Sequence, residues 1–240
     1  MSLSRLVPTA LTSAALLLGT AAAGLAQNPA QAERPDDHAI GAADAPLLIV
    51  EYASYACPHC AHFQEDAWPA VREEFIETGQ VRWVYRPTLT NPIQLAGAGI
   101  ILAECAAEDR FFDATDLLFA EQAALFEAAR SGGDVLGVYN RIGAAVGLNS
   151  EAFMACLQDP AMNEAVNAAA IQANEDGIPG TPSFIIGGEL LAIVREEGRS
   201  IWHWGGEPLM LDGERVPVEL NGDSFSRIVL HFLNSSDSEN

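Results

Sequence analysis

The feature that most constrains this chain is a pair of cysteines, Cys57 and Cys60, placed where an apolar run gives way to a charged segment. The apolar run, residues 47–50, has the length of a buried strand, and residues 62–78 follow a helical period. Cys57 is therefore expected at the N-terminus of a helix. Free backbone N–H groups and the positive end of the helix dipole favour a thiolate there. The pattern predicts a redox-active cysteine pair.

The four cysteines of the chain allow more than one interpretation. A structural zinc site needs four ligands, and the sequence offers neither a second close cysteine pair nor a histidine pair at matching spacing, so we predict no metal. Three disulfide pairings are possible in principle. The simplest makes Cys57 and Cys60 the catalytic pair and joins Cys105 to Cys156 in a structural bridge. Two buried free thiols are the alternative for the second pair.

The N-terminal residues predict export to the periplasm. Residues 1–26 contain Arg5, a mostly apolar stretch and a small-x-Ala site before Gln27, as in a secretory signal peptide. We expect the mature chain to begin near Gln27 with a loose leader to residue 45. Because no cysteine follows the cleavage site and no later apolar run is long enough to span a bilayer, we expect no membrane anchor.

The charge of the chain argues against two classes of partner. The formal net charge is −21, and all 12 basic residues are arginines. A surface this acidic repels phosphate backbones and anionic lipids. We therefore expect neither nucleic-acid binding nor peripheral attachment to a membrane.

The order of the predicted elements indicates an α/β fold with a helical insertion. A strand at 47–50, a helix kinked at Pro69 and a strand at 81–86 form a right-handed crossover with parallel strands. Only helix signals follow, up to residue 176. A third strand is predicted at 183–186, after a proline-rich turn. We assign the domains as 46–90 and 177–234 for the two parts of the α/β unit and 91–176 for the insertion.

Several details of these elements are also predicted. In the insertion, Asn91 and Ser150 are the expected N-caps of the first and fourth helices, Asp134 and Asp159 those of the third and fifth, and residues 111–129 form one helix. We expect a β-hairpin extension over residues 189–220, with strand pieces at 200–204 and 216–220. A last helix spans 225–233, and residues 235–240 form a disordered tail.

The motifs together resemble the thioredoxin fold, and more closely the DsbA-like thiol:disulfide oxidoreductases with a helical insertion. The resemblance rests on Cys57-Pro58-His59-Cys60 after an apolar strand, Glu51 six positions earlier, Thr181-Pro182 before the third strand, and the helical block between the two halves. The chain departs from the family at Ala56, where many relatives carry an aromatic residue, and in the longer segment after residue 188. A pair such as Cys105 and Cys156 occurs in some relatives only.

The resemblance implies a role for each motif. Cys57 would form a mixed disulfide with substrate, and Pro58 and His59 would tune its thiolate. Glu51 would move a proton to and from Cys60; the alternative is an acid at a sheet edge. Thr181 would pair with an extended substrate beside a cis Pro182; the alternative is an ordinary trans proline.

We therefore expect a monomeric oxidase that needs no cofactor and donates its Cys57–Cys60 disulfide to reduced exported proteins. Its reoxidation would need a membrane partner of the DsbB type or another oxidant. A reductase or isomerase is one rival, and a binding protein or chaperone that uses the 189–220 extension is another. We expect Trp202 and Trp204 to pack the hairpin on the sheet, and His62 to lie on a solvated helix face.

Overall fold

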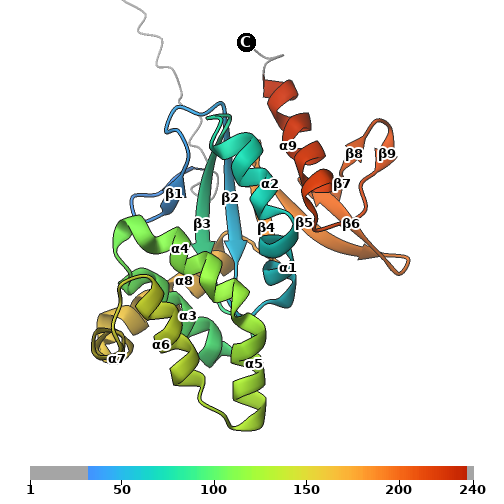
Figure 1. Cartoon of the computed structure of the whole chain (residues 1–240). Helices are drawn as coiled ribbons and strands as arrows, with labels where there is room; N and C mark the ends of the chain where they lie inside the picture. The colour runs from blue at the N-terminus through green and yellow to red at the C-terminus, as the bar shows by residue number, and fades with distance from the viewer. Residues whose placement is uncertain (1–31, 237–240) are drawn as a thin grey trace, which may run out of the picture.

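A computed structural model describes residues 32–236. A seven-stranded sheet runs through the molecule in the order β1-β3-β2-β4-β5-β6-β7 (Figure 1). Its strands are β1 (His38–Ile40), β2 (Leu47–Ala53), β3 (Val81–Pro87), β4 (Ser183–Ile186), β5 (Glu189–Glu196), β6 (Arg199–Trp204) and β7 (Glu207–Pro208). A separate two-stranded ribbon consists of β8 (Met210–Leu211) and β9 (Glu214–Arg215).

The predicted crossover is confirmed, because β2 and β3 are parallel, with Glu51 opposite Tyr85. β4 pairs with the other edge of β2 in the antiparallel sense. β2 is therefore an inner strand, which agrees with its almost continuous apolar sequence. The short edge strand β1, antiparallel to β3, was not predicted, since three residues carry too little pattern.

One face of the sheet is covered by α1 (Pro58–Asp66), α2 (Trp68–Val71), the π-helical turn η2 (Arg72–Ile76) and α9 (Gly222–Ser236) (Figure 1). The predicted kink is present, and the helix breaks at Ala67, two residues before Pro69, whose missing N–H removes one ladder bond. Between these helices and the sheet lies an aromatic core of Phe63, Trp83, Phe184, Trp202 and Phe225.

The helical insertion lies between β3 and β4 in the chain. It consists of α3 (Ile93–Cys105), a short 3-10 turn (Glu108–Arg110), α4 (Phe111–Ala120), α5 (Gln122–Ser131), α6 (Val135–Ala145), α7 (Ser150–Gln158) and α8 (Pro160–Glu175). These helices surround a second apolar core that continues to the cysteine pair. In Figure 1 they form a body at one end of the sheet.

Three predicted helix boundaries in the insertion are wrong. The N-cap of α3 is Pro92, because its backbone is extended while its carbonyl accepts the first bonds of the helix, which leaves Asn91 outside. The N-cap of α7 is Asn149, whose side chain accepts a bond from Ala152 N at 2.9 Å, rather than Ser150. Residues 111–129 form two helices, because the backbone turns at Glu121. The caps at Asp134 and Asp159 are confirmed.

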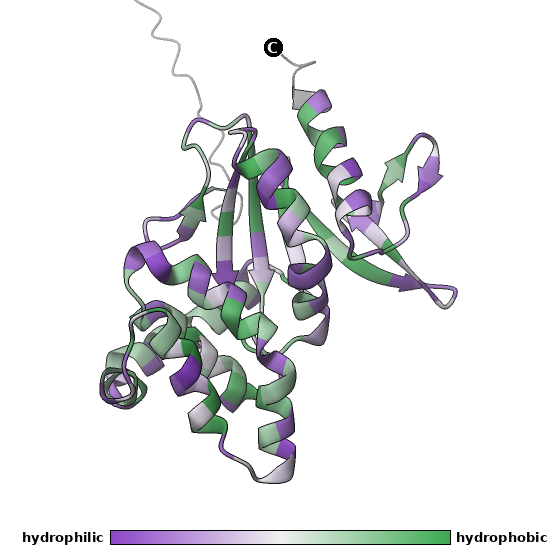
Figure 2. Cartoon of the chain, in the orientation of Figure 1, coloured by the Kyte–Doolittle hydropathy of each residue, from purple (hydrophilic) through white to green (hydrophobic). Residues whose placement is uncertain are grey.

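The predicted hairpin extension is confirmed, with β5 and β6 as its two long strands. Trp202 is buried against Phe225, and the half-buried Trp204 packs against Phe232, so the packing interpretation also holds. The strand predicted at 216–220 is wrong. This segment makes one isolated bridge, Ile201 to Pro217, which is flanked by hydrogen bonds from Trp202 N to Val216 O and from Val218 N to Ser200 O. In Figure 2 most of β5 is coloured hydrophobic and the tip of the hairpin hydrophilic.

Two predictions concern the ends of the chain. The signal segment 1–26 lies outside the described residues, as does the tail beyond residue 236. The last helix, α9, continues through Ser236, past the predicted end at residue 233, so residues 235 and 236 belong to the helix rather than to a tail. Across residues 32–236, no helix has both the length and the apolar character needed to cross a membrane.

Candidate active site

The two cysteines lie at the end of β2, where the chain enters α1. Cys57 is the N-cap residue of α1, in an extended conformation, and Pro58 occupies the first helical position. Both cysteines carry free thiols in this structure. Cys57 is 7% exposed and Cys60 is fully buried, so a reacting molecule meets Cys57 first. Pro58 and His59 lie on the surface between them.

The surroundings of Cys57 favour its thiolate. A hydrogen bond from the Cys60 thiol is the largest cause, and the backbone N–H groups of Cys60 and His59 add to it, whereas burial opposes it. Together they lower the pKa of Cys57 from 9.0 to about 6. His59 contributes here through its backbone N–H, as expected at the first turn of a helix.

Cys60 is held in the opposite state. Burial raises its pKa well above the usual value, and the hydrogen bond that it gives to Cys57 adds to this effect. At neutral pH the reduced site therefore holds one thiolate and one thiol. This asymmetry suits thiol–disulfide exchange, in which the outer sulfur leaves readily and the inner sulfur must gain or lose a proton.

Glu51 lies in the interior, below the cysteines. It is 1% exposed, and its Oε2 accepts a hydrogen bond from Trp83 Nε1 at 3.3 Å, while Oε1 has no partner among the described residues. Burial raises the pKa of Glu51 to about 8, against the lowering effect of the Trp83 bond. Because β2 is an inner strand, the interpretation of Glu51 as an acid at a sheet edge is wrong.

The turn before β4 lies against the thiols. The Thr181–Pro182 peptide bond is cis, and the Thr181 carbonyl oxygen lies 3.2 Å from Cys57 Sγ, where it accepts a hydrogen bond from Cys57 when this thiol is protonated. Ser183 Oγ donates to Gly180 O at 2.8 Å and closes the turn. Sequence positions 51, 57 and 181 are thus brought to one end of the sheet.

Gln122, which the sequence analysis missed, supports the active-site turn from the helical insertion. Its buried Nε2 donates to Tyr55 O at 2.8 Å and to Cys57 O at 3.1 Å. Gly99 is required beside the same turn, because a Cβ there would lie 2.9 Å from the Tyr55 ring. No local motif marks either residue, since each acts on a segment far from it in the sequence.

The remaining singled-out residues lie away from the thiols. Cys105 and Cys156 form a disulfide, with an S–S distance of 2.08 Å, that joins the end of α3 to α7. His62 lies exposed on α1 beside Asp66, on a solvated helix face as predicted. No three His, Cys, Asp or Glu side chains gather as a metal site would need within residues 32–236.

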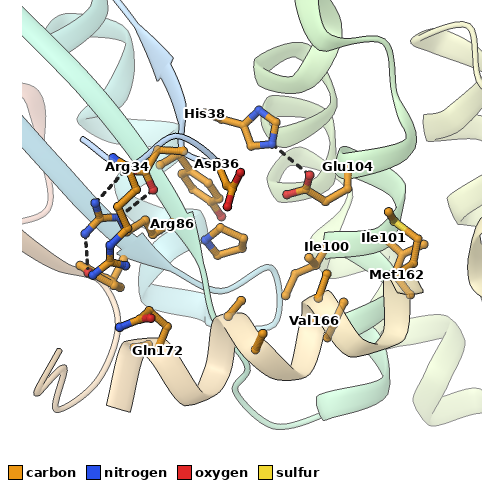
Figure 3. Close-up of a pocket in the computed structure, with 18 residues that line it drawn as sticks. Arg34, Asp36, His38, Arg86, Ile100, Ile101, Glu104, Met162, Val166 and Gln172 are labelled. Atoms are coloured by element: carbon orange, nitrogen blue, oxygen red, sulfur yellow. Dashed lines mark hydrogen bonds and ion pairs between the residues drawn. The ribbon is translucent and has the colours of Figure 1, made fainter. Parts of the chain in front are cut away.

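A cavity of about 390 Å³ lies between β1, β3, α3 and α8, on the face of the sheet that α1 and α9 do not cover (Figure 3). Its wall includes Ile100 and Val166, and charged residues stand at its rim. Both arginines of the rim are paired within the protein, Arg34 with Asp176 at 2.7 Å and Arg86 with Asp37 at 2.6 Å. Neither Cys57 nor Cys60 lines this cavity. Since these thiols are the reactive groups, we place the candidate active site at the cysteine pair rather than in the cavity.

Comparisons with known proteins agree with this placement. Residues 33–200 match the family described as Thioredoxin. A provisionally named protein-disulfide oxidoreductase of Rickettsia typhi is 26% identical over 154 residues, which cover 64% of this chain and 55% of that protein. Disulfide bond formation protein D of Bacillus subtilis is 32% identical over 90 residues, covering 35% of this chain and 38% of that protein. The chain thus spans about half the length of the curated relatives that it matches.

Solved structures show the same fold. The crystal structure of alpha-DsbA1 from Wolbachia pipientis superposes with a TM-score of 0.63 at 22% identity, covering 86% of this chain and 96% of that one. The sheet, the cysteine turn and the inserted helices are therefore those of a DsbA-like fold.

Proposed function

The chain belongs to the thioredoxin family, and on that premise we propose that it is a DsbA-like thiol:disulfide oxidoreductase. The observation that carries the proposal is the opposite shift of the two pKa values in the pair, down for Cys57 and up for Cys60. Two structural cysteines would not need this asymmetry. An exchange site needs it, because its two sulfurs take different roles in each cycle.

In the proposed reaction the protein starts with Cys57 and Cys60 joined in a disulfide. A substrate thiolate attacks Cys57 Sγ, the disulfide bond breaks, and Cys60 leaves and takes up a proton. A second substrate thiolate attacks the substrate sulfur of the mixed disulfide, and Cys57 leaves as a thiolate. Two substrate thiols have then lost two electrons to the cysteine pair. The two substrate thiols also release two protons: one makes up for the proton that Cys60 takes up, and the other goes to solvent.

Glu51 is the proposed source of the proton for Cys60. A carboxyl group with a pKa near 8 is mostly protonated at neutral pH and can give its proton to a leaving sulfur. Thr181, beside the cis Pro182, is the proposed partner for the backbone of an extended substrate, since main-chain pairing accepts many sequences. We propose that Pro58 and His59 set the geometry and exposure of the pair, and that the Cys105–Cys156 bridge has a structural role.

We further propose that the chain acts as an oxidase. Stabilising the Cys57 thiolate stabilises the reduced form, and a stable reduced form makes the disulfide a strong oxidant. Its substrates would be reduced proteins in the periplasm, reached after removal of residues 1–26, and its reoxidant a membrane protein of the DsbB type. The domain boundaries at residues 46, 91 and 177 belong to the same proposal, as does a monomeric state.

The test is the equilibrium reduction potential of the Cys57–Cys60 pair against glutathione, in a variant lacking Cys105 and Cys156. A value near −120 mV, roughly that of a strong oxidant, would support the oxidase, and one near −270 mV, roughly that of thioredoxin, would make a reductase the better proposal. Cys57→Ser tests the rival binding protein or chaperone. An oxidase loses all activity with this change, whereas a binder keeps its affinity.

A further inference from the structure

Two neighbouring residues each bury an oxygen atom that has no hydrogen-bond partner among the described residues: Glu51, with Oε1, and Tyr85, with its hydroxyl. Glu51 on β2 and Tyr85 on β3 stand directly opposite each other in the parallel ladder, so their side chains lie on the same face of the sheet. The two residues are 1% and 2% exposed. Because buried polar groups are nearly always paired, this pair calls for a functional explanation.

The Tyr85 hydroxyl is suited to passing a proton on. Burial raises its pKa well above the usual value, and nearby Tyr55, Glu51 and Cys60 add to the effect. The hydroxyl therefore stays protonated and can give up a proton only as it receives another, which a group that both donates and accepts can do. The Tyr55 ring stacks on Tyr85 at 5.8 Å between centroids, and the Tyr55 hydroxyl is bonded to Thr115 Oγ1 at 2.9 Å, which fixes the pair of rings.

Tyr85 also lines the cavity of about 390 Å³ between β1, β3, α3 and α8. Arg86 lines it too, although successive residues of a strand point to opposite faces. The cavity therefore passes around the edge of β3, which is open there because the ladder with β1 ends at the pair of His38 and Tyr85. His38 and Glu104 form part of the wall and are partly exposed, so this wall meets solvent (Figure 3).

Exchange needs a route for protons that avoids Cys57. In the mixed disulfide the substrate is bound to Cys57 and covers the exposed side of the pair. Glu51 must still regain the proton that it gives to Cys60, and at 1% exposure it has no direct access to solvent.

We propose that Tyr85 passes protons between Glu51 and water in this cavity, so that Glu51 exchanges its proton with solvent while substrate is bound at Cys57. This inference rests on the proposed function and adds a residue and a solvent entrance to it. Tyr85 acts through Glu51 and is therefore a positioning residue of the reaction.

The proposed transfer balances. Cys60 leaves the disulfide and takes the proton of Glu51. The Glu51 carboxylate then takes the proton of the Tyr85 hydroxyl, through a water molecule between the two unpaired oxygens, while the Tyr85 oxygen takes a proton from water in the cavity. One proton has moved from solvent to Cys60, and Tyr85 ends as it began. Reoxidation of the cysteine pair runs the same route in reverse.

The first test is a double-mutant cycle on the oxidation of glutathione by the oxidised protein. Tyr85→Phe removes only the hydroxyl and should slow the reaction about ten-fold, a part of the roughly 100-fold or more that general acid–base catalysis supplies. In the Glu51→Gln background the same change should have no effect, because the group through which Tyr85 acts is gone. Equal slowing in both backgrounds, or slowing in neither, would overturn the inference.

Stability separates this role from a structural one. Since the Tyr85 hydroxyl has no partner among the described residues, Tyr85→Phe should not lower the midpoint of urea unfolding. Tyr139→Phe is the matched control, because its buried hydroxyl donates to Leu95 O at 2.7 Å. It should lower the midpoint and leave the rate of exchange unchanged. A midpoint lowered as much by Tyr85→Phe as by Tyr139→Phe would show a structural role and overturn the inference.

The cavity is tested separately, from α8. Ala169→Trp places a large side chain in the cavity, and Ala161→Trp, on the same helix but outside the cavity wall, is its control. We expect Ala169→Trp to slow the oxidation of glutathione about ten-fold, only where Glu51 is present, and Ala161→Trp to leave the rate unchanged. An unchanged rate in Ala169→Trp would overturn the inference. If the unsubstituted protein fails to oxidise glutathione, or Glu51→Gln matches its rate, the proposed function itself fails.

Discussion

Replacing Glu51 by glutamine should change the dependence of stability on pH. In the folded protein the pKa of this carboxyl is raised from 4.5 to about 8, chiefly by burial. Between these values the folded state binds more protons than the unfolded state, so the free energy of unfolding of the unsubstituted protein falls as pH rises. Glutamine carries no titrating group, so the variant lacks this loss.

The size of the effect follows from the shift. Between pH 4.5 and pH 7 Glu51 is ionised in the unfolded chain but stays protonated in the folded protein. Over these 2.5 pH units the difference lowers the free energy of unfolding by about 3 kcal/mol. The variant should therefore gain about 3 kcal/mol relative to the unsubstituted protein between pH 4 and pH 7. Any cost of burying the amide is the same at both pH values and cancels from this difference.

The assay is urea unfolding of the oxidised proteins at pH 4 and pH 7, where Cys57 and Cys60 form a disulfide and do not titrate. Glu65→Gln is the control, since it removes an exposed carboxylate from the neighbouring helix α1. It should give nearly the same difference at both pH values. A difference for Glu51→Gln that stays constant within about 0.5 kcal/mol, the usual range for surface substitutions, would refute the argument that burial holds this carboxyl neutral.

Three further predictions concern the cysteines and their support. In the reduced protein the absorbance of thiolate at 240 nm should rise with a midpoint near pH 6, and Cys57→Ser should remove this step, because Cys60 stays protonated there; a midpoint near 9 would contradict it. Replacing Cys105 and Cys156 by alanine should lower the free energy of unfolding by about 4 kcal/mol, from the entropy of an open loop with a separation of 51 residues. Chemical denaturation measures this loss, and an unchanged midpoint would argue against a bridge. Gln122→Ala should cost about 2 kcal/mol by the same measurement, because two buried carbonyl groups lose their donor, and should slow exchange with glutathione; unchanged stability and rate would show that the turn does not need this support.

Part of the site could be predicted from the sequence because it is local. The spacing of Cys57 and Cys60 after an apolar strand places the first cysteine at a helix N-terminus, and backbone N–H groups are present at any such terminus. The order of strands and helices was predictable for a similar reason, since periodicity and turn residues act within a few positions. Boundaries such as Asn149 in place of Ser150 were missed because neighbouring residues of similar capping ability compete.

Other features depend on segments that meet only in the folded chain. Gln122 supports the Cys57 turn across a separation of 65 residues, and the unpaired oxygen of Glu51 follows from what surrounds an inner strand. The sequence by itself thus determined the reactive pair and the order of the fold, through short-range geometry. The tertiary structure alone decided which distant side chains support the thiols, because this depends on long-range packing between segments that lie far apart in the chain.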